Sequence, residues 1–142
     1  MVRLLEKSFT AGVAVEAAWT HLQNVEAWPT WAKHIRKIEL SPPGELAAGS
    51  RGTIHLANRI RSTFQVVELE PFVRWKWVGP FLWLAVHYDH RFRGLGPKRT
   101  ELTFVVEAEG PGAAILGRPF AAVYRRNLDR AVTALVRELE SL

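Results

Sequence analysis

Apolar residues recur with two different periods along the chain, and the changes of period mark where helices and strands are expected. Residues 3–9 have the pattern of a strand, which residues 10–12 interrupt. Residues 15–22 favour a helix. A second short helical piece follows Asn24 and ends near residues 31–33. Two short helices are therefore predicted directly after the first strand.

From Ile35 onward the apolar period shortens towards two, which predicts a series of strands. These strands are expected at residues 34–40, 51–57, 61–69, 73–78, 83–93 and 99–109. Turn-forming residues separate them, at positions 42–44, 57–58, 70–71, 79–80 and 94–97. Connections this short are typical of hairpins, so consecutive strands are expected to pair antiparallel.

The C-terminal part of the chain returns to a helical period and predicts one long amphipathic helix. Pro119 permits two starting points for it. The proline lies in the first turn, after a cap at Gly117 and Arg118, or it kinks a helix that begins nearer Gly112. The apolar stripe of the helix consists of Phe120, Tyr124, Leu128, Ala131, Val132, Leu135 and Leu139.

Two tryptophans flank Pro29 in the sequence EAWPTWAKHI, where the helical pattern gives way to strands. We expect Trp31 to pack inward beneath the long helix and to fix the angle of the two short helices. Trp28, on the other side of the proline, is expected nearer to the mouth of an internal cavity.

The composition predicts a single domain over residues 1–142, because 48% hydrophobic and 23% charged residues suffice to bury a core. The absence of cysteine excludes disulfides and thiolate chemistry and favours a reducing compartment, so we expect a cytoplasmic protein. Glu6 and Lys7 argue against a signal peptide. The longest nearly apolar run, residues 77–86, is about half of what a membrane-spanning helix needs.

The net charge of +5 comes mainly from 14 arginines, which bind phosphate and carboxylate groups well. Several of the basic residues fall on the predicted outer face of neighbouring strands. They form a basic stripe, which gives one functional hypothesis: binding to RNA, a ribosome or an anionic membrane. No binding to DNA is expected. The stripe consists of Arg74, Lys76, Arg91, Arg93 and Arg99.

The order of the predicted elements resembles the helix-grip fold of the START and pollen-allergen (SRPBCC) superfamily. More narrowly, the chain is similar to its polyketide cyclase/dehydrase-like branch. The resemblance covers nearly the whole chain and is carried by residues 15–19, 25–31, 49–52, 67–71, 90–92 and 99–103.

This resemblance implies an α+β fold in which a curved seven-stranded antiparallel sheet wraps around a long C-terminal helix. Two short helices lie between strands 1 and 2. The resemblance also implies an internal cavity for a small hydrophobic ligand, such as an aromatic compound, a polyketide, a quinone or a lipid. The leading hypothesis is therefore a START-like carrier or sensor, a monomer or weak dimer without a cofactor.

Strand alternation and the helical stripe indicate which side chains face that cavity. Aromatic side chains would offer flat apolar walls, with Tyr88, His90 and Tyr124 as orienting polar groups. The same pattern also arises when aromatic side chains fill a core, and both interpretations stay open. The predicted ligand-binding residues are Trp28, Ile54, Leu56, Trp75, Trp77, Tyr88, His90, Phe92, Phe104, Phe120, Tyr124 and Leu128.

The alternative hypothesis is a cyclase or dehydratase that uses a histidine in the same cavity as its acid or base. His90 and Tyr88 are the first candidates. His87 and Asp89 alternate onto the opposite, solvent-facing side, unless a bulge in residues 83–93 turns them inward. At most two of the three possible ligands in this segment share a face, too few for a zinc site, so no metal is expected.

Overall fold

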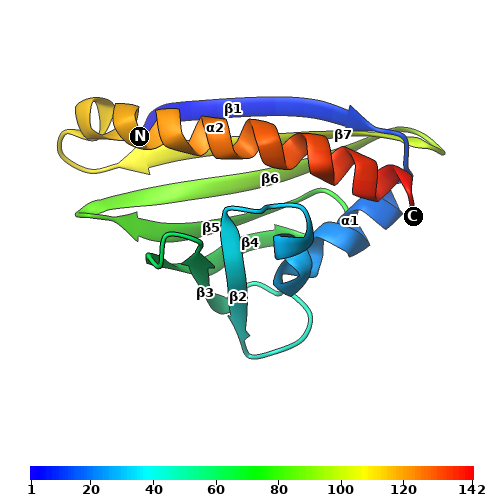
Figure 1. Ribbon diagram of the computed structural model, residues 1–142, viewed down its shortest axis with the longest axis horizontal. Coiled ribbons are helices and arrows are strands. Elements are labelled where there is room, and N and C mark those ends of the chain that lie inside the picture. Colours follow the sequence, from blue (N-terminus) through cyan, green and yellow to red (C-terminus); the bar gives the residue numbers. More distant parts are fainter.

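A seven-stranded antiparallel sheet curves around a 28-residue helix in the computed structural model, which describes residues 1–142 (Figure 1). The strand order is β1-β7-β6-β5-β4-β3-β2, so every strand after β2 pairs with the one before it and β1 closes the sheet beside β7. The strands are β1 (Val2–Ala11), β2 (Ile35–Ser41), β3 (Arg51–Leu56), β4 (Arg61–Glu70), β5 (Arg74–Phe81), β6 (Leu84–Gly96) and β7 (Arg99–Glu109).

The helices also follow the predicted order. Helix α1 (Val15–Gln23) and the 3-10 helix η1 (Val25–Thr30) connect β1 to β2, and α2 (Ala113–Glu140) ends the chain. The predicted α+β helix-grip fold is therefore confirmed. The apolar period alone located every element, because each of them buries one face against the same core.

Helix α2 begins close to Gly112, the second of the two starting points that the sequence left open. Gly112 adopts a left-handed backbone conformation (φ 74°), which glycine tolerates without strain. Pro119 then lies inside the helix. Its missing N–H leaves the Ile115 carbonyl without an intrahelical partner, at a position whose side chain is 80% exposed.

The two halves of α2 are buried to different degrees. In the C-terminal half Leu128, Ala131, Val132, Leu135 and Leu139 are all buried. In the N-terminal half only Ala113 and Gly117 are buried. The other apolar side chains before Leu128 remain at least partly exposed.

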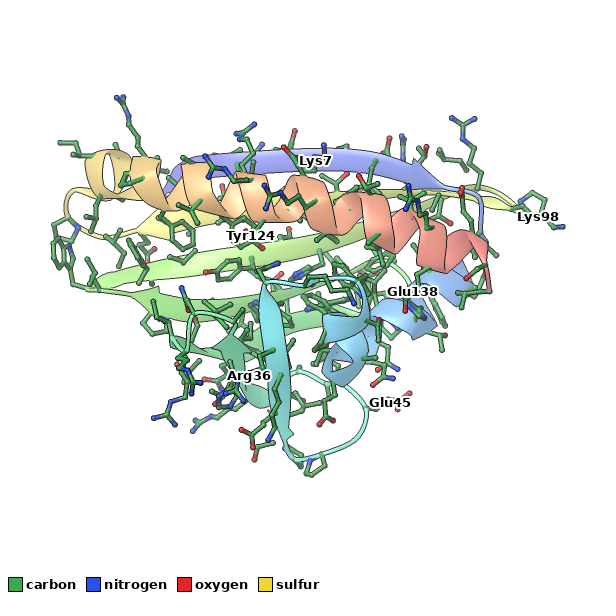
Figure 2. The ribbon with its side chains drawn as sticks, in the orientation of Figure 1. Lys7, Arg36, Glu45, Lys98, Tyr124 and Glu138 are labelled. Carbon is green, nitrogen blue, oxygen red and sulfur yellow. The ribbon has the colours of Figure 1, made fainter.

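Both ends of α2 are fixed to the first elements of the chain. A Cβ atom on Gly117 would collide with Leu4 of β1, so glycine permits the close approach of helix and strand there. At the other end, the Glu138 carboxylate accepts hydrogen bonds from Thr30 Oγ1 (2.8 Å) and contacts His21 Nε2 (3.0 Å) (Figure 2). Helix α2 therefore bridges the sheet and the short helices.

One predicted turn is wrong. Gly79 and Pro80 lie inside β5, and the chain turns instead at Leu82, which has φ 55°. Gly79 approaches the Thr63 carbonyl of β4 so closely that a Cβ atom would clash, so this glycine serves strand packing. The β4–β5 pairing ends at Gln65 and Val78, so the missing N–H of Pro80 breaks no bond in that ladder.

Candidate functional site

The pairing of β5 with β6 decides which histidine points inward. Its register runs from Arg74 opposite Arg91 to Phe81 opposite Leu84 without a shift. Strict alternation therefore places His90 and Tyr88 on the inner face with Trp75 and Trp77. His87 and Asp89 stay on the outer face, as the alternation predicted, because no bulge turns them.

The interior beneath α1 and η1 is filled with aromatic rings. Trp75 lies 4.5 Å from His90 and 5.4 Å from Trp19, and Trp77 stacks on Phe64 at 4.1 Å, all between ring centroids. These rings therefore pack directly against one another. Seven predicted lining residues are at most 7% exposed: Trp28, Trp75, Trp77, His90, Phe92, Phe104 and Leu128.

The sequence places Trp28 nearer to the mouth of a cavity, but the structure buries it in this core. Its indole is 7% exposed, and Nε1 donates a hydrogen bond to the Leu22 carbonyl (2.8 Å). The ring centroid of Trp31 lies 5.1 Å away, and Trp31 is 3% exposed. Because η1 continues through Pro29, both indoles stay on its inner side and pack against each other.

His90 is buried without a charged partner on its own face of the sheet. Its Nδ1 lies 3.3 Å from the carbonyl oxygen of Trp75, to which the neutral ring donates. Burial lowers the pKa of His90 to about 4. A histidine this hard to protonate is a weak general base and fits a core residue that satisfies its own hydrogen bond.

A second group of inward side chains lies between the less buried N-terminal half of α2 and strands β5 and β6. Tyr124 extends from α2 towards β6 (Figure 2), where its ring centroid lies 5.8 Å from that of Tyr88. Phe120 stacks on Tyr124 at 5.8 Å and lies 4.8 Å from Phe81 of β5. All four side chains are partly exposed. We call Phe81, Tyr88, Phe120 and Tyr124 the tyrosine site.

The two phenol groups of this site have no hydrogen-bonding partner in the protein. Burial raises the pKa of Tyr124 to about 12, and burial together with Tyr124 raises the pKa of Tyr88 further. Both hydroxyls are therefore protonated at neutral pH and free to donate. A partly buried hydroxyl gains most from a partner, which water or a bound ligand supplies here.

The remaining predicted lining residues, Ile54 and Leu56, are partly buried on the inner face of β3. Phe81 was missed, because the turn assigned to Gly79 and Pro80 ended the predicted strand too early. The apolar run continues from Phe81 through Leu84, and this signal would have extended β5.

Asp89 is buried on the outer face, on the opposite side of the sheet from the tyrosine site. Its Oδ2 accepts hydrogen bonds from Arg74 Nη2 (3.1 Å) and Arg91 Nε (2.8 Å), and the side chain is 3% exposed. Both ring nitrogens of His87 are buried without a partner. The sheet therefore separates these two catalytic candidates from Tyr88 and His90.

The predicted basic stripe on this outer face is largely paired. Arg74 also contacts Glu68 at 3.0 Å, and Arg93 contacts Glu101 at 3.0 Å. Lys76 and Arg99 form no ion pair, and Arg91 is held by Asp89. The five basic side chains therefore meet three carboxylates, Glu68, Asp89 and Glu101, which lowers the net positive charge of the stripe.

Two hollows lie on the same outer face. One of about 650 Å³ has Thr53, Thr63 and Gln65 among its lining residues, and one of about 450 Å³ lies beside Arg74, Arg91 and Arg93. Their polar lining differs from the apolar cavity expected for the ligand. No group of three or more His, Cys, Asp or Glu side chains is placed to hold a metal ion. No helix is long and apolar enough to cross a membrane.

Comparison with known proteins agrees with the fold. The family model described as polyketide cyclase / dehydrase and lipid transport matches residues 3–140. No curated protein matches this sequence.

Solved structures give the same architecture at low sequence identity. The Zhui aromatase/cyclase from Streptomyces sp. R1128 is 19% identical with a TM-score of 0.73, covering 96% of this chain and 92% of that one. A START superfamily protein from Mycobacterium smegmatis is 15% identical with a TM-score of 0.72, covering 95% and 97%. A hypothetical protein from Helicobacter pylori is 16% identical with a TM-score of 0.76, covering 94% and 85%. Identities this low establish a shared fold, and function has to be argued from the site.

Proposed function

The chain belongs to the polyketide cyclase / dehydrase and lipid transport family, and on this premise we propose that it binds a small hydrophobic ligand at the tyrosine site, as a carrier or sensor. The ligand would lie between the N-terminal half of α2 and strands β5 and β6. One observation carries the proposal: Tyr88 and Tyr124 face each other from sheet and helix, and neither hydroxyl is bonded to the protein.

The chemistry of the site favours an aromatic ligand with oxygen substituents. Phe81 and Phe120 offer flat apolar surfaces, while the two phenols supply hydrogen bonds at one edge. A quinone or a polyphenol combines both features. A fatty acid would use the apolar walls but would have to bury its carboxylate charge between two neutral phenols.

Binding without turnover is the function that we favour over a cyclase or dehydratase activity. The enzyme hypothesis needs a base at the ligand, and its first candidate, His90, is enclosed by aromatic rings and has a pKa near 4. The raised pKa values keep both tyrosines protonated at neutral pH, so they can donate hydrogen bonds, but these pKa values lie far from the range that suits a general acid or base. His87 and Asp89 lie across the sheet.

The proposal is tested by binding measurements on matched hydroxyl deletions. The purified protein is examined by native mass spectrometry for a retained small molecule and titrated with a naphthoquinone, a flavonoid and palmitate. Tyr88→Phe and Tyr124→Phe each remove one hydroxyl of the tyrosine site, and Thr63→Val removes one from the outer hollow as the control.

We expect the quinone or the flavonoid to bind, with affinity reduced about two- to tenfold by either tyrosine substitution and unchanged by Thr63→Val. The opposite pattern would place the ligand in the outer hollow and reject the proposal. Absence of binding for all three compounds, with no retained molecule, would reject it as well.

A further inference from the structure

The outward face of the N-terminal half of α2 carries positive charge that no acidic side chain neutralises. Arg118, Arg125 and Arg126 are exposed, and none of them forms an ion pair. The next acidic residue along the helix, Asp129, contacts Lys7 at 3.2 Å. These three arginines represent a large part of the net charge of +5 and are free to bind an anionic partner.

The same surface also exposes large apolar side chains. Ile115 and Val123 lie on the outward side of α2 and are 80% and 63% exposed. In the turn between β5 and β6, Leu82 and Trp83 are 66% and 65% exposed. Exposed apolar side chains that gather in one place commonly mark a site of contact.

The turn and the start of the helix are held together, so the exposed residues of the turn adjoin the outward face of α2. Trp83 Nε1 donates a hydrogen bond to the Pro111 carbonyl (2.8 Å), just before α2 begins. The β5–β6 turn and the first turns of α2 lie at the same end of the molecule (Figure 1). We call this the end surface; its members are Leu82, Trp83, Ile115, Arg118, Val123, Arg125 and Arg126.

We infer that the end surface docks on an anionic lipid bilayer. A bilayer interface accepts both kinds of side chain at once, because arginines bind the phosphate groups while leucine, isoleucine and tryptophan enter the boundary with the acyl chains. RNA would also attract the arginines but would leave Leu82 and Ile115 in water. The contact would be peripheral, because the side chains of the end surface enter the interface without crossing the bilayer.

The inference is tested by co-sedimentation with vesicles of phosphatidylcholine alone and of phosphatidylcholine mixed with phosphatidylglycerol. The charge variant carries Arg118→Gln, Arg125→Gln and Arg126→Gln. Its control removes three exposed, unpaired charges elsewhere, through Arg36→Gln, Arg61→Gln and Lys98→Gln. Figure 2 labels Arg36 on β2 and Lys98 at the opposite end of the molecule from the β5–β6 turn.

An apolar variant carries Leu82→Gln and Ile115→Gln, and its control carries Ile60→Gln and Leu95→Gln. The control residues are 58% and 42% exposed, Ile60 in the connection between β3 and β4 and Leu95 near the end of β6. Thermal unfolding checks that all four variants keep their fold, and binding to a single-stranded RNA is measured in parallel.

We expect the native protein to bind only the vesicles with phosphatidylglycerol, more weakly as salt is added. The charge variant should lose about a hundredfold in affinity, since each arginine near an anionic surface contributes about a factor of five. The apolar variant should lose binding too, and both controls should bind like the native protein.

Equal loss in the charge variant and its control would overturn the inference. So would vesicle binding that survives in the apolar variant, or RNA binding that is stronger than vesicle binding and depends on the same arginines. No ligand enters these measurements, so a failure here leaves the proposal for the tyrosine site standing, and the reverse also holds.

Discussion

The imidazole of His90 lies flat against the indole of Trp75, with ring centroids 4.5 Å apart and an angle of 20° between the planes. The same histidine bonds through Nδ1 to the Trp75 carbonyl, on the strand that pairs with its own. The two residues thus join β5 to β6 through side chain and backbone together. This arrangement explains why the most promising catalytic candidate of the sequence serves the core.

His90 should make the protein less stable in mild acid. Burial lowers its pKa from 6.5 to about 4, so between these two pH values the unfolded chain binds a proton that the folded protein refuses. Above pH 6.5 His90 therefore does not reduce the free energy of unfolding. As the pH drops towards 4, this residue lowers the free energy of unfolding by roughly 3 kcal/mol.

Urea unfolding as a function of pH measures this slope, and His90→Gln is the matched variant because its amide keeps a donor and does not titrate. We expect a flatter profile for the variant. Burial also lowers the pKa of His34, so the variant should still lose some stability as the pH falls, with a smaller slope than the native protein. Equal slopes in the native protein and the variant would contradict the assignment.

The two tyrosines should resist ionisation. They are the only tyrosines in the chain, so ultraviolet absorbance in an alkaline titration reports on them alone. Since burial raises both pKa values above 10, we expect no tyrosinate near pH 10 and its appearance only around pH 12 or on unfolding. A transition near pH 10 in the folded protein would mean that the tyrosine site is open to water.

Trp28→Ala and Trp31→Ala should both destabilise the fold, by about 3–5 kcal/mol each, because both indoles are buried and pack on one another. The Trp28 substitution also leaves the Leu22 carbonyl without its donor. Chemical unfolding measures both effects. Trp28→Phe, which keeps a ring, should recover much of the loss; if Trp28→Ala changed ligand affinity with the stability unaltered, Trp28 would belong to the site.

Asp89→Ala should cost about 1–3 kcal/mol of stability, since it leaves Arg74 and Arg91 without their shared carboxylate. Glu68→Ala, which removes the exposed second partner of Arg74, is the control and should change stability by less than about 0.5 kcal/mol. Neither change should affect ligand binding at the tyrosine site. A loss of binding in Asp89→Ala with intact stability would reopen a functional role for this carboxylate.

Sequence periodicity and the short turns determined the order of elements, the antiparallel pairing of consecutive strands and the inner face of most strands, but not the pairing of β1 with β7. Each of these is tied to the burial of one face of a helix or strand, and the spacing of apolar residues indicates which face is buried. Tyr88, Phe120 and Tyr124 could be assigned to the interior for the same reason. The end of β5 was placed too early, because Gly79 and Pro80 have the composition of a turn, whereas in the folded sheet Gly79 permits a close approach to β4.

Only the tertiary structure decided which inward side chains are core and which border a site. Trp75 and Tyr88 both alternate inward, yet Trp75 is enclosed by Trp19, Trp77 and His90, whereas Tyr88 lies under the less buried half of α2. Ion pairing could not be read from the sequence either: Arg74 and Arg93 meet carboxylates from neighbouring strands, whereas Arg118, Arg125 and Arg126 of α2 meet none. Periodicity reports on which face is buried, whereas packing and charge neutralisation depend on partners that only the fold brings together.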